Sequence, residues 1–365
     1  MKINLKQYLL ATFAVAAISL SSCSKDKPVT PEEEVVPVKG VFVLNEGSMG
    51  ANNSSISYLD FTTEELTKDI FSVNNEGQLL GSGVSDMDVY GSLLFVIATE
   101  SNKVEILNAS NAKVLKTITV EKPRFVAFHS GKAFVTSYTN KVIVIDTLTK
   151  NTIDEIAVGR NPEYIVTLGN KLYVANSGSS DAITGGEYDN RVMIINPTSL
   201  KVEDEIEVAD NVYHLFTNDR GELFANTMDV YVGVWPLSVL DKPSRLYKIN
   251  TATKEVEKAF EFGAGLMSFS QNKAYLISYN FEENKTNLLE MDLTSSVVKK
   301  SNIFNEAALS HPNYPYALSV NPKNGDLWYA NSDYTNPGIV YHYNNGSKEI
   351  KEYTVGLNPS VFVFN

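Results

Sequence analysis

Residues 355–365 read VGLNPSVFVFN, and this phrase repeats one that occurs several times upstream. The clear copies are EKPRFVAF (121–128), GRNPEYIVT (159–167) and PNYPYALSV (312–320), and the looser ones are SGVSDMDV (82–89), ADNVYHLFT (209–217) and GAGLMSFS (263–270). The seven copies lie roughly 38 to 54 residues apart, close to the interval at which β-propeller blades repeat. The last copy lacks a following set of strands, and the strand GVFVLNEGS (40–48) lacks a preceding copy, so the two would complete each other in a closed ring.

Each repeat has the same order of strands, which is clearest in residues 159–208. An inner strand (163–168), a second strand (171–176), a third strand (191–196) and an acidic outer strand (202–208) follow one another. The pair Gly169-Asn170 suits a two-residue hairpin turn, because both residue types tolerate positive φ. We therefore predict an all-β fold, a seven-bladed β-propeller that the C-terminal strand closes.

The N-terminal residues have the pattern of a bacterial lipoprotein signal. Lys2 and Lys6 precede an apolar stretch that is too short to span a bilayer, and it leads into Leu20-Ser21-Ser22-Cys23. We predict a lipoprotein signal peptide at 1–22, lipidation of Cys23, a flexible anchored linker at 23–38 and the propeller at 39–365. The alternative is an ordinary secretory signal that contains a coincidental cysteine.

Composition and motifs argue against nucleic-acid binding and catalysis. The formal net charge is −12 and no basic run occurs, which disfavours a nucleic-acid partner. The four histidines lack zinc-ligand spacing, and neither G-x-S-x-G nor a phosphate-binding glycine loop is present. We therefore predict no catalytic residue, no metal site and no cofactor.

One face of the ring should carry the function. The loops from each second strand to its third strand emerge on the same face as the loops between blades, and we name it the long-loop face. Its loops are long in blades one, four, five, six and seven (45–55, 176–191, 226–245, 278–287 and 331–338), whereas the opposite face consists mostly of tight turns. Function usually resides on such loops of a rigid scaffold.

Polar and aromatic residues gather where the mouth of the ring is expected. Small polar residues end every second strand, and they bind either ligand or the loop backbone. Tyrosines and other aromatics on the loops and at the inner-strand entries fit an amphipathic ligand or pack the loops together. The candidate ligand-binding residues are Asn45, Tyr138, Tyr164, Asn176, Tyr188, Tyr213, His214, Asn226, Tyr231, Trp235, Tyr279, Phe281, Tyr314, Asn331 and Tyr334.

The blade-five loop (226–245) is unusually apolar for a solvated loop. Either it folds on itself as a compact packed loop, or it covers a ligand or a partner.

The chain resembles the YncE-like, YVTN-type propellers in its inner strands that begin with Asn-Pro and in the segments LYVANS (172–177) and IDTLTKNTIDEI (145–156). Residues 42–60 and 317–343 further resemble the BtuG-like propeller lipoproteins of gut Bacteroidetes, and residues 23–27 loosely resemble their surface-export signal. The resemblance implies an outer-membrane, surface-exposed lipoprotein that binds a corrinoid such as cobalamin as a transported ligand. It implies delivery of this ligand to a TonB-dependent outer-membrane transporter.

Two other functions remain open at this stage. A glycan- or protein-binding adhesion propeller would use the same aromatic surface. A metal-dependent, lactonase-like hydrolase would need ligands such as Asn45, Glu46, Asn176 and Asn226 around the channel.

Overall fold

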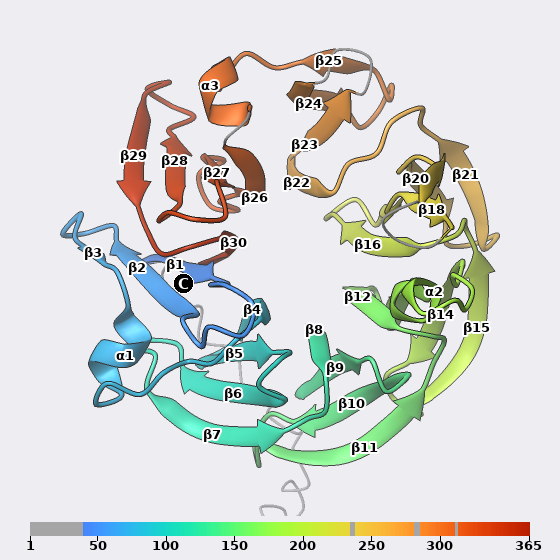
Figure 1. Cartoon of the computed structure of the whole chain (residues 1–365), viewed down its shortest axis with the longest axis horizontal. Helices are drawn as coiled ribbons and strands as arrows, with labels where there is room; N and C mark the ends of the chain where they lie inside the picture. The colour runs from blue at the N-terminus through green and yellow to red at the C-terminus, as the bar shows by residue number, and fades with distance from the viewer. Residues whose placement is uncertain (1–38, 234–237, 281–284, 311–312) are drawn as a thin grey trace, which may run out of the picture. The chain divides into compact units, whose positions relative to one another are not determined.

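The computed structural model describes residues 39–365, apart from 234–237, 281–284 and 311–312. In this part of the chain, seven four-stranded antiparallel sheets form the blades of a ring, and a separate two-stranded sheet projects from blade five (Figure 1). The predicted seven-bladed propeller is confirmed. The predictions on residues 1–38, including Cys23, lie outside the described residues, as do Trp235 and Phe281.

The blades run from the innermost to the outermost strand as follows. Blade one contains β30 (Pro359–Phe364), β1 (Gly40–Asn45), β2 (Ser55–Asp60) and β3 (Leu66–Thr67). Blade two contains β4 (Val84–Tyr90), β5 (Leu93–Ala98), β6 (Lys103–Asn108) and β7 (Val114–Thr119). Blade three contains β8 (Pro123–His129), β9 (Lys132–Ser137), β10 (Lys141–Asp146) and β11 (Asn151–Ala157). Blade four contains β12 (Pro162–Leu168), β13 (Lys171–Asn176), β14 (Arg191–Asn196) and β15 (Lys201–Glu207).

The remaining blades follow the same order. Blade five contains β16 (Val212–Thr217), β17 (Leu223–Thr227), β20 (Leu246–Asn250) and β21 (Glu255–Ala259), with the hairpin β18 (Val230–Val232) and β19 (Val239–Lys242) inserted between β17 and β20. Blade six contains β22 (Leu266–Ser270), β23 (Lys273–Asn280), β24 (Lys285–Asp292) and β25 (Val298–Lys300). Blade seven contains β26 (Tyr314–Val320), β27 (Leu327–Ser332), β28 (Ile339–Tyr343) and β29 (Ile350–Thr354).

The ring is closed by strands from the two ends of the propeller. β30 pairs antiparallel with β1, with Val41 opposite Phe364 and Leu44 opposite Val361. Because side chains alternate along a strand, Val361 and Val363 join the core shared with blade two, whereas Phe362 and Phe364 join the core shared with blade seven. The predicted closure is therefore confirmed in strand position and in facing.

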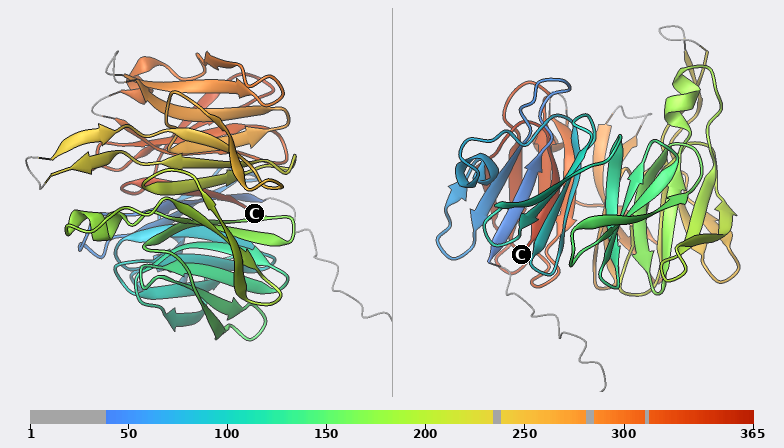
Figure 2. Two further views of the ribbon diagram at one scale, coloured as in Figure 1. Left: turned by 90° about the vertical axis from the view of Figure 1, so that its right-hand side faces the viewer. Right: turned by 90° about the horizontal axis from the view of Figure 1, so that it is seen from below.

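The two faces of the ring differ as the loop lengths predict. The hairpin β18–β19 and the short helix α2 (Ser179–Ile183) project from the long-loop face (Figure 2). β1 begins and β30 ends on the tight-turn face, where the Lys39 N–H donates to the Asn365 carbonyl group. The chain therefore enters the propeller opposite to the long loops.

Three short helices interrupt the strand pattern in the described residues. α1 (Ile70–Asn74) follows the two-residue strand β3, α2 lies in the loop of blade four, and α3 (Glu306–Leu309) joins blades six and seven. Asp69 caps α1 and Asn305 caps α3, each through its side-chain oxygen. None of these helices is long and apolar enough to cross a membrane.

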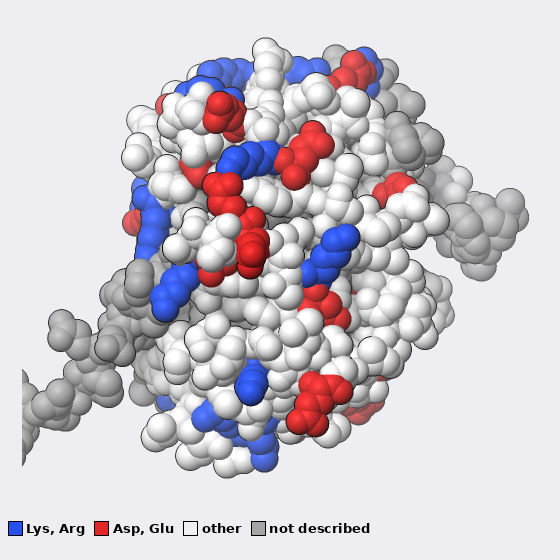
Figure 3. Space-filling model, turned by 90° about the vertical axis from the view of Figure 1, so that its left-hand side faces the viewer, with Lys and Arg blue, Asp and Glu red and all other residues white. Residues whose placement is uncertain are grey.

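The outer strands are charged and largely exposed. In β15 only Ile206 is buried, and in β11 only Ile156 is buried. Charges on an edge strand discourage pairing with other chains. On the flank that Figure 3 shows, basic and acidic side chains are interspersed among uncharged residues.

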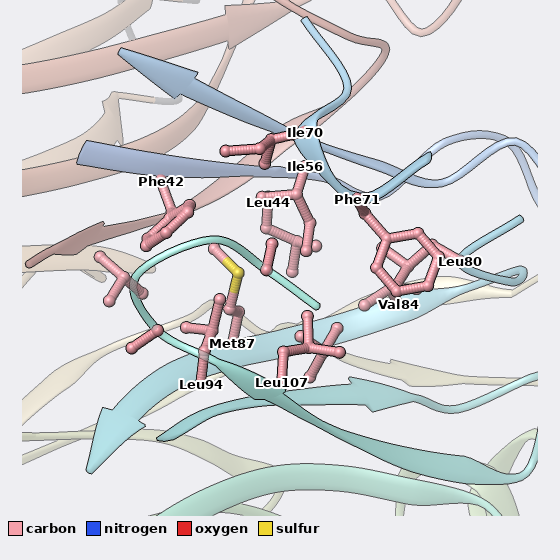
Figure 4. Packing of buried hydrophobic residues seen from close by; sticks show 14 of the residues in the cluster. Phe42, Leu44, Ile56, Ile70, Phe71, Leu80, Val84, Met87, Leu94 and Leu107 are labelled. Atoms are coloured by element: carbon pink, nitrogen blue, oxygen red, sulfur yellow. The ribbon is translucent and has the colours of Figure 1, made fainter. Parts of the chain in front are cut away.

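The hydrophobic core lies between successive blades. Leu172 and Val174 of β13 face blade three, whereas Tyr173 and Ala175 face blade five, so both faces of the strand are apolar. Figure 4 shows the corresponding packing between blades one and two, where Phe42, Leu44 and Met87 meet. These interfaces hold the blades in a rigid ring on which the loops are displayed.

Candidate functional site

The asparagines at the ends of the second strands hold the loops of the long-loop face in place. The four asparagines among the predicted site residues are at most 1% exposed: Asn45, Asn176, Asn226 and Asn331. The side-chain oxygen of Asn45 accepts the Gly356 N–H at 3.0 Å, and that of Asn226 accepts the Ala264 N–H at 2.7 Å. The side chains of the other two donate to backbone carbonyl groups. These bonds favour the structural interpretation of the polar ring, although Asn226 also lines a pocket described below.

A buried ion pair joins three blades at the ring axis. The Arg124 Nε of β8 donates to the Glu163 Oε2 of β12 at 3.0 Å, and its Nη2 donates to the Tyr213 hydroxyl of β16 at 2.6 Å. The guanidinium carbon of Arg124 lies 4.8 Å from the ring centroid of Tyr138, and the Tyr138 hydroxyl donates to Glu163. Blades three and five are not neighbours, so the bond to Tyr213 extends past the inner strand of blade four. The predicted residues Tyr138 and Tyr213 thus belong to a structural network.

Burial controls the electrostatics of this network. The side chain of Glu163 is fully buried, and loss of solvation raises the pKa of its carboxyl group although Arg124 opposes the shift. Burial acts to lower the pKa of Arg124, but the charge of Glu163, the tyrosines Tyr213 and Tyr138 and the hydrogen bond to Glu163 together outweigh it and raise this pKa. Breaking such a pair by removing one partner typically costs about 3–5 kcal/mol, because the other charge is left buried.

An aromatic cluster surrounds the ion pair. The His214 ring lies 4.8 Å from the Tyr164 ring and 4.6 Å from the Tyr213 ring, measured between centroids. The centroids of the Phe125 and Tyr164 rings lie 3.9 Å apart, and the rings are tilted by 31°. Burial lowers the pKa of His214 to about 3, so this histidine is neutral at physiological pH. Tyr164, Tyr213 and His214 are therefore packed together around the axis.

A pocket of about 460 Å³ opens on the long-loop face between blades five, six and seven, and we name it the tyrosine pocket. Its walls come from the end of β17, the loop into β22, the ends of β23 and β26, and the loop after β27. The residues that line it are Asn226, Met228, Asp229, Ser244, Gly263, Gly265, Leu266, Ile277, Tyr279, Thr286, Tyr314, Pro315 and Tyr334. The structure thus brings four of the predicted residues, Asn226 and the three tyrosines, to one pocket.

The tyrosines of this pocket present their rings to solvent. Tyr279, Tyr314 and Tyr334 are 44%, 42% and 55% exposed. The rings of Tyr314 and Tyr334 lie 5.5 Å apart and are tilted by 47°, so they form a corner. Tyr334 has a φ of 63°, a left-handed conformation that is uncommon for a bulky residue. Strained residues of this kind concentrate at functional sites.

A second pocket of about 310 Å³ adjoins the first through Tyr334, which lines both, and we name it the glutamate pocket. The Tyr316 hydroxyl donates to the Glu46 Oε2 at 2.5 Å, and burial raises the pKa of Glu46. Glu100, at the rim, accepts bonds from the Ser82 hydroxyl and the Gly50 N–H, and these bonds lower its pKa.

The other predicted residues lie elsewhere. Tyr188 is half-buried in the blade-four loop, where its carbonyl oxygen accepts an N–H of Arg160 at 2.8 Å. Tyr231 is 48% exposed on the hairpin β18–β19, and its hydroxyl donates to the Asp229 Oδ2 at 3.4 Å. No group of three or more His, Cys, Asp or Glu side chains among the described residues is placed to hold a metal ion.

Sequence reasoning missed Arg124, Glu163 and Asp229 as parts of this face. Arg124 follows Pro123 and Glu163 follows Pro162, so opposite charges occupy the same position in consecutive copies of the repeat. A charge in an otherwise apolar inner strand was the available signal for the pair. Asp229 carried no such signal, because the hairpin that positions it has no counterpart in the other blades.

The chain matches the family described as "Domain of unknown function (DUF5074)" over residues 39–365, and it belongs to this family. None of the curated proteins matches it. Solved structures with the same fold include Kuenenia stuttgartiensis hydrazine synthase, with 16% identity and a TM-score of 0.57 over 78% of this chain and 92% of that one.

Two further structures are similar. The β-propeller domain of Myceliophteria thermophila Cps50 (Swd1) has 11% identity and a TM-score of 0.55, over 83% of this chain and 91% of that one. Apo AztD from Citrobacter koseri has 10% identity and a TM-score of 0.55, over 89% of this chain and 97% of that one. At these identities the similarity shows the fold alone.

Proposed function

We propose that this DUF5074 propeller is a non-enzymatic, cell-surface lipoprotein that binds a corrinoid on its long-loop face and delivers it to a TonB-dependent outer-membrane transporter. The observation that carries the proposal is the tyrosine pocket, where Tyr279, Tyr314 and Tyr334 meet beside the glutamate pocket. The resemblance to BtuG-like surface lipoproteins supports the class of ligand and the class of partner.

The pocket suits the shape of a corrinoid. A corrin ring is a wide, flat, amphipathic disc that is fringed with amides. Exposed tyrosine rings would pack against its apolar edges, and the Asp229 carboxylate would accept hydrogen bonds from its amides. The ligand is larger than either pocket, so it would lie across both with Tyr334 beneath it. A rigid scaffold lowers the ordering cost of binding.

The visible spectrum of the protein tests this function directly. The purified mature chain is incubated with cobalamin and desalted, and we expect the cobalamin absorbance to elute with the protein. Tyr334→Ala should weaken binding at least about tenfold, because buried aromatic contacts dominate such interfaces. Its melting temperature should stay unchanged, since Tyr334 is more than half exposed.

Lys323→Ala provides the matched control, because Lys323 is exposed in a turn of the tight-turn face. This variant should bind like the wild type. The proposal fails if calorimetry shows no heat and no co-elution occurs with several cobamides at micromolar protein.

One observation favours a second function, binding of a protein partner. On the hairpin β18–β19, Tyr231, Val232, Val239 and Leu240 are 48%, 52%, 65% and 37% exposed. Apolar residues concentrated on a projecting element often mark a protein contact. A protein captured through this hairpin by a chain that binds no cobamide would favour adhesion over corrinoid capture.

A further inference from the structure

We infer that the tyrosine pocket accepts a positively charged organic group, with the Asp229 carboxylate as its counter-charge. This inference rests on the proposed function in taking the long-loop face as the binding face, and it adds the charge of the group that binds there.

Asp229 is held in place but incompletely paired. Its Oδ1 accepts the Ser244 N–H at 2.7 Å, whereas its Oδ2 accepts a longer bond, 3.4 Å, from the Tyr231 hydroxyl. The Asn211 side chain donates to the Asp229 carbonyl oxygen at 2.9 Å and fixes the backbone. The half-buried carboxylate thus lines the pocket with acceptor capacity to spare.

The cationic side chains that follow along the same segment are paired elsewhere. Lys242 bonds Asp210 at 2.6 Å, and Arg245 bonds Glu261 at 3.0 Å. The described residues that line the tyrosine and glutamate pockets include Asp229, Glu46 and Glu100 but neither lysine nor arginine. Arg124, which lies outside both linings, acts on Glu46, but the tyrosine pocket has no lining cation beside Asp229.

The tyrosine rings of the pocket also favour a positively charged group. The face of a tyrosine ring carries partial negative charge and attracts a cation within about 6 Å of the ring centroid. Tyr314 and Tyr334 form a corner, with ring centroids 5.5 Å apart, and Tyr279 lines the same pocket. Three aromatic rings with one carboxylate is the composition of sites for alkylammonium groups, whereas a metal ion prefers several oxygen ligands.

The charge also bears on how a corrinoid would lie. Its nucleotide tail carries a phosphate, which these pockets have no cation to receive. The phosphate should therefore point to solvent, away from Asp229.

Choline and 3,3-dimethylbutan-1-ol test the inference, because they share a shape and differ in charge. Ligand-observed NMR titration of the purified mature chain should show choline binding at least about tenfold more tightly than the neutral alcohol. Asp229→Asn should abolish this preference while it preserves the melting temperature, since the asparagine oxygen still accepts the Ser244 N–H. Tyr314→Leu should weaken choline binding, and Lys323→Ala should leave it unchanged.

Equal binding of the two probes, binding of neither, or an unchanged preference in Asp229→Asn would overturn the inference. A separate titration with cobalamin distinguishes the two proposals. Asp229-dependent choline binding without cobalamin binding would end the corrinoid function and keep the charge assignment. Cobalamin binding by a chain that binds choline and the neutral alcohol equally would keep the corrinoid function and end the charge assignment.

Discussion

Arg124, on the inner strand of blade three, bonds to residues on the inner strands of blades four and five, so a single side chain links three inner strands. Its partners Glu163 and Tyr213 come from the next two copies of the sequence repeat. The repeat predicted where these residues lie along their strands. The hydrogen bond from Arg124 to Tyr213, which extends past the inner strand of blade four, was not predictable, because it depends on how the seven inner strands converge in space.

The ion pair makes a prediction about stability. Arg124→Met should lower the free energy of unfolding by about 3–5 kcal/mol, because it leaves the Glu163 carboxylate buried and unpaired. The double variant Arg124→Met with Glu163→Gln should recover much of this loss, since no buried charge remains. Chemical denaturation of the single and double variants measures both effects. A double variant no more stable than Arg124→Met would contradict the prediction.

Asp88, on the inner strand β4, makes stability depend on pH. Burial raises its pKa from 3.8 to about 6, so between these values the folded chain holds a proton that the unfolded chain releases. The free energy of unfolding contributed by Asp88 therefore falls as the pH rises from about 4 to about 6 and stays low above that.

The variant Asp88→Asn should flatten this dependence on pH, because an asparagine side chain does not titrate. The fold should be preserved, since the side-chain oxygen of asparagine can still accept the Val89 N–H. Melting temperatures at pH 4.5 and 7.5 test this, and the gain over the wild type should be larger at pH 7.5. Asp86, whose pKa burial raises to about 7, remains in both proteins. An equal difference between the two proteins at both pH values would refute the assignment.

At the scale of elements, periodicity located the strands well and the insertions poorly. The second strand 171–176 and the third strand 191–196 of blade four were predicted at the bounds that β13 and β14 have. Their alternating apolar residues face the two neighbouring blades, which is a strong local signal. The helix α2 and the hairpin β18–β19 have no such repeat, and loop length alone did not reveal their structure.

The closing strand gives the prediction at this scale. Removal of residues 358–365 should abolish cooperative unfolding, because it takes β30 from β1 and opens two cores that contain Phe362 and Val363. Differential scanning calorimetry of the truncated chain should show a broad transition or none. A sharp transition at the wild-type temperature would show that the ring does not depend on this strand.

At the scale of the whole propeller, the long loops and the point of chain entry lie on opposite faces. Loop lengths alone predicted which face would be elaborate, since tight turns leave little room for side chains to form a site. The pocket itself was predictable only in part. Its tyrosines were named from the loops, but their meeting beside Asp229 depends on the angles between blades five, six and seven.

The proposed lipidation of Cys23 gives the prediction for the intact protein. Cys23→Ala should move the propeller from the membrane fraction to the soluble fraction and should remove it from the surface of intact cells. Fractionation and whole-cell protease treatment measure this. If protease never reaches the wild-type propeller in intact cells, the chain faces the periplasm and surface capture fails.

The entry of the chain on the tight-turn face has a kinetic consequence for a tethered protein. A linker of residues 23–38 reaches at most about 55 Å when fully extended, so an anchored propeller samples only a thin shell above the membrane. Within that shell its effective concentration toward any membrane partner is in the range of about millimolar. The described chain begins at Lys39 on the tight-turn face, so the polypeptide joins the ring on the side opposite to the pockets. Under the proposed function, a weak encounter between the ligand-bearing face and a transporter would then be sufficient for transfer.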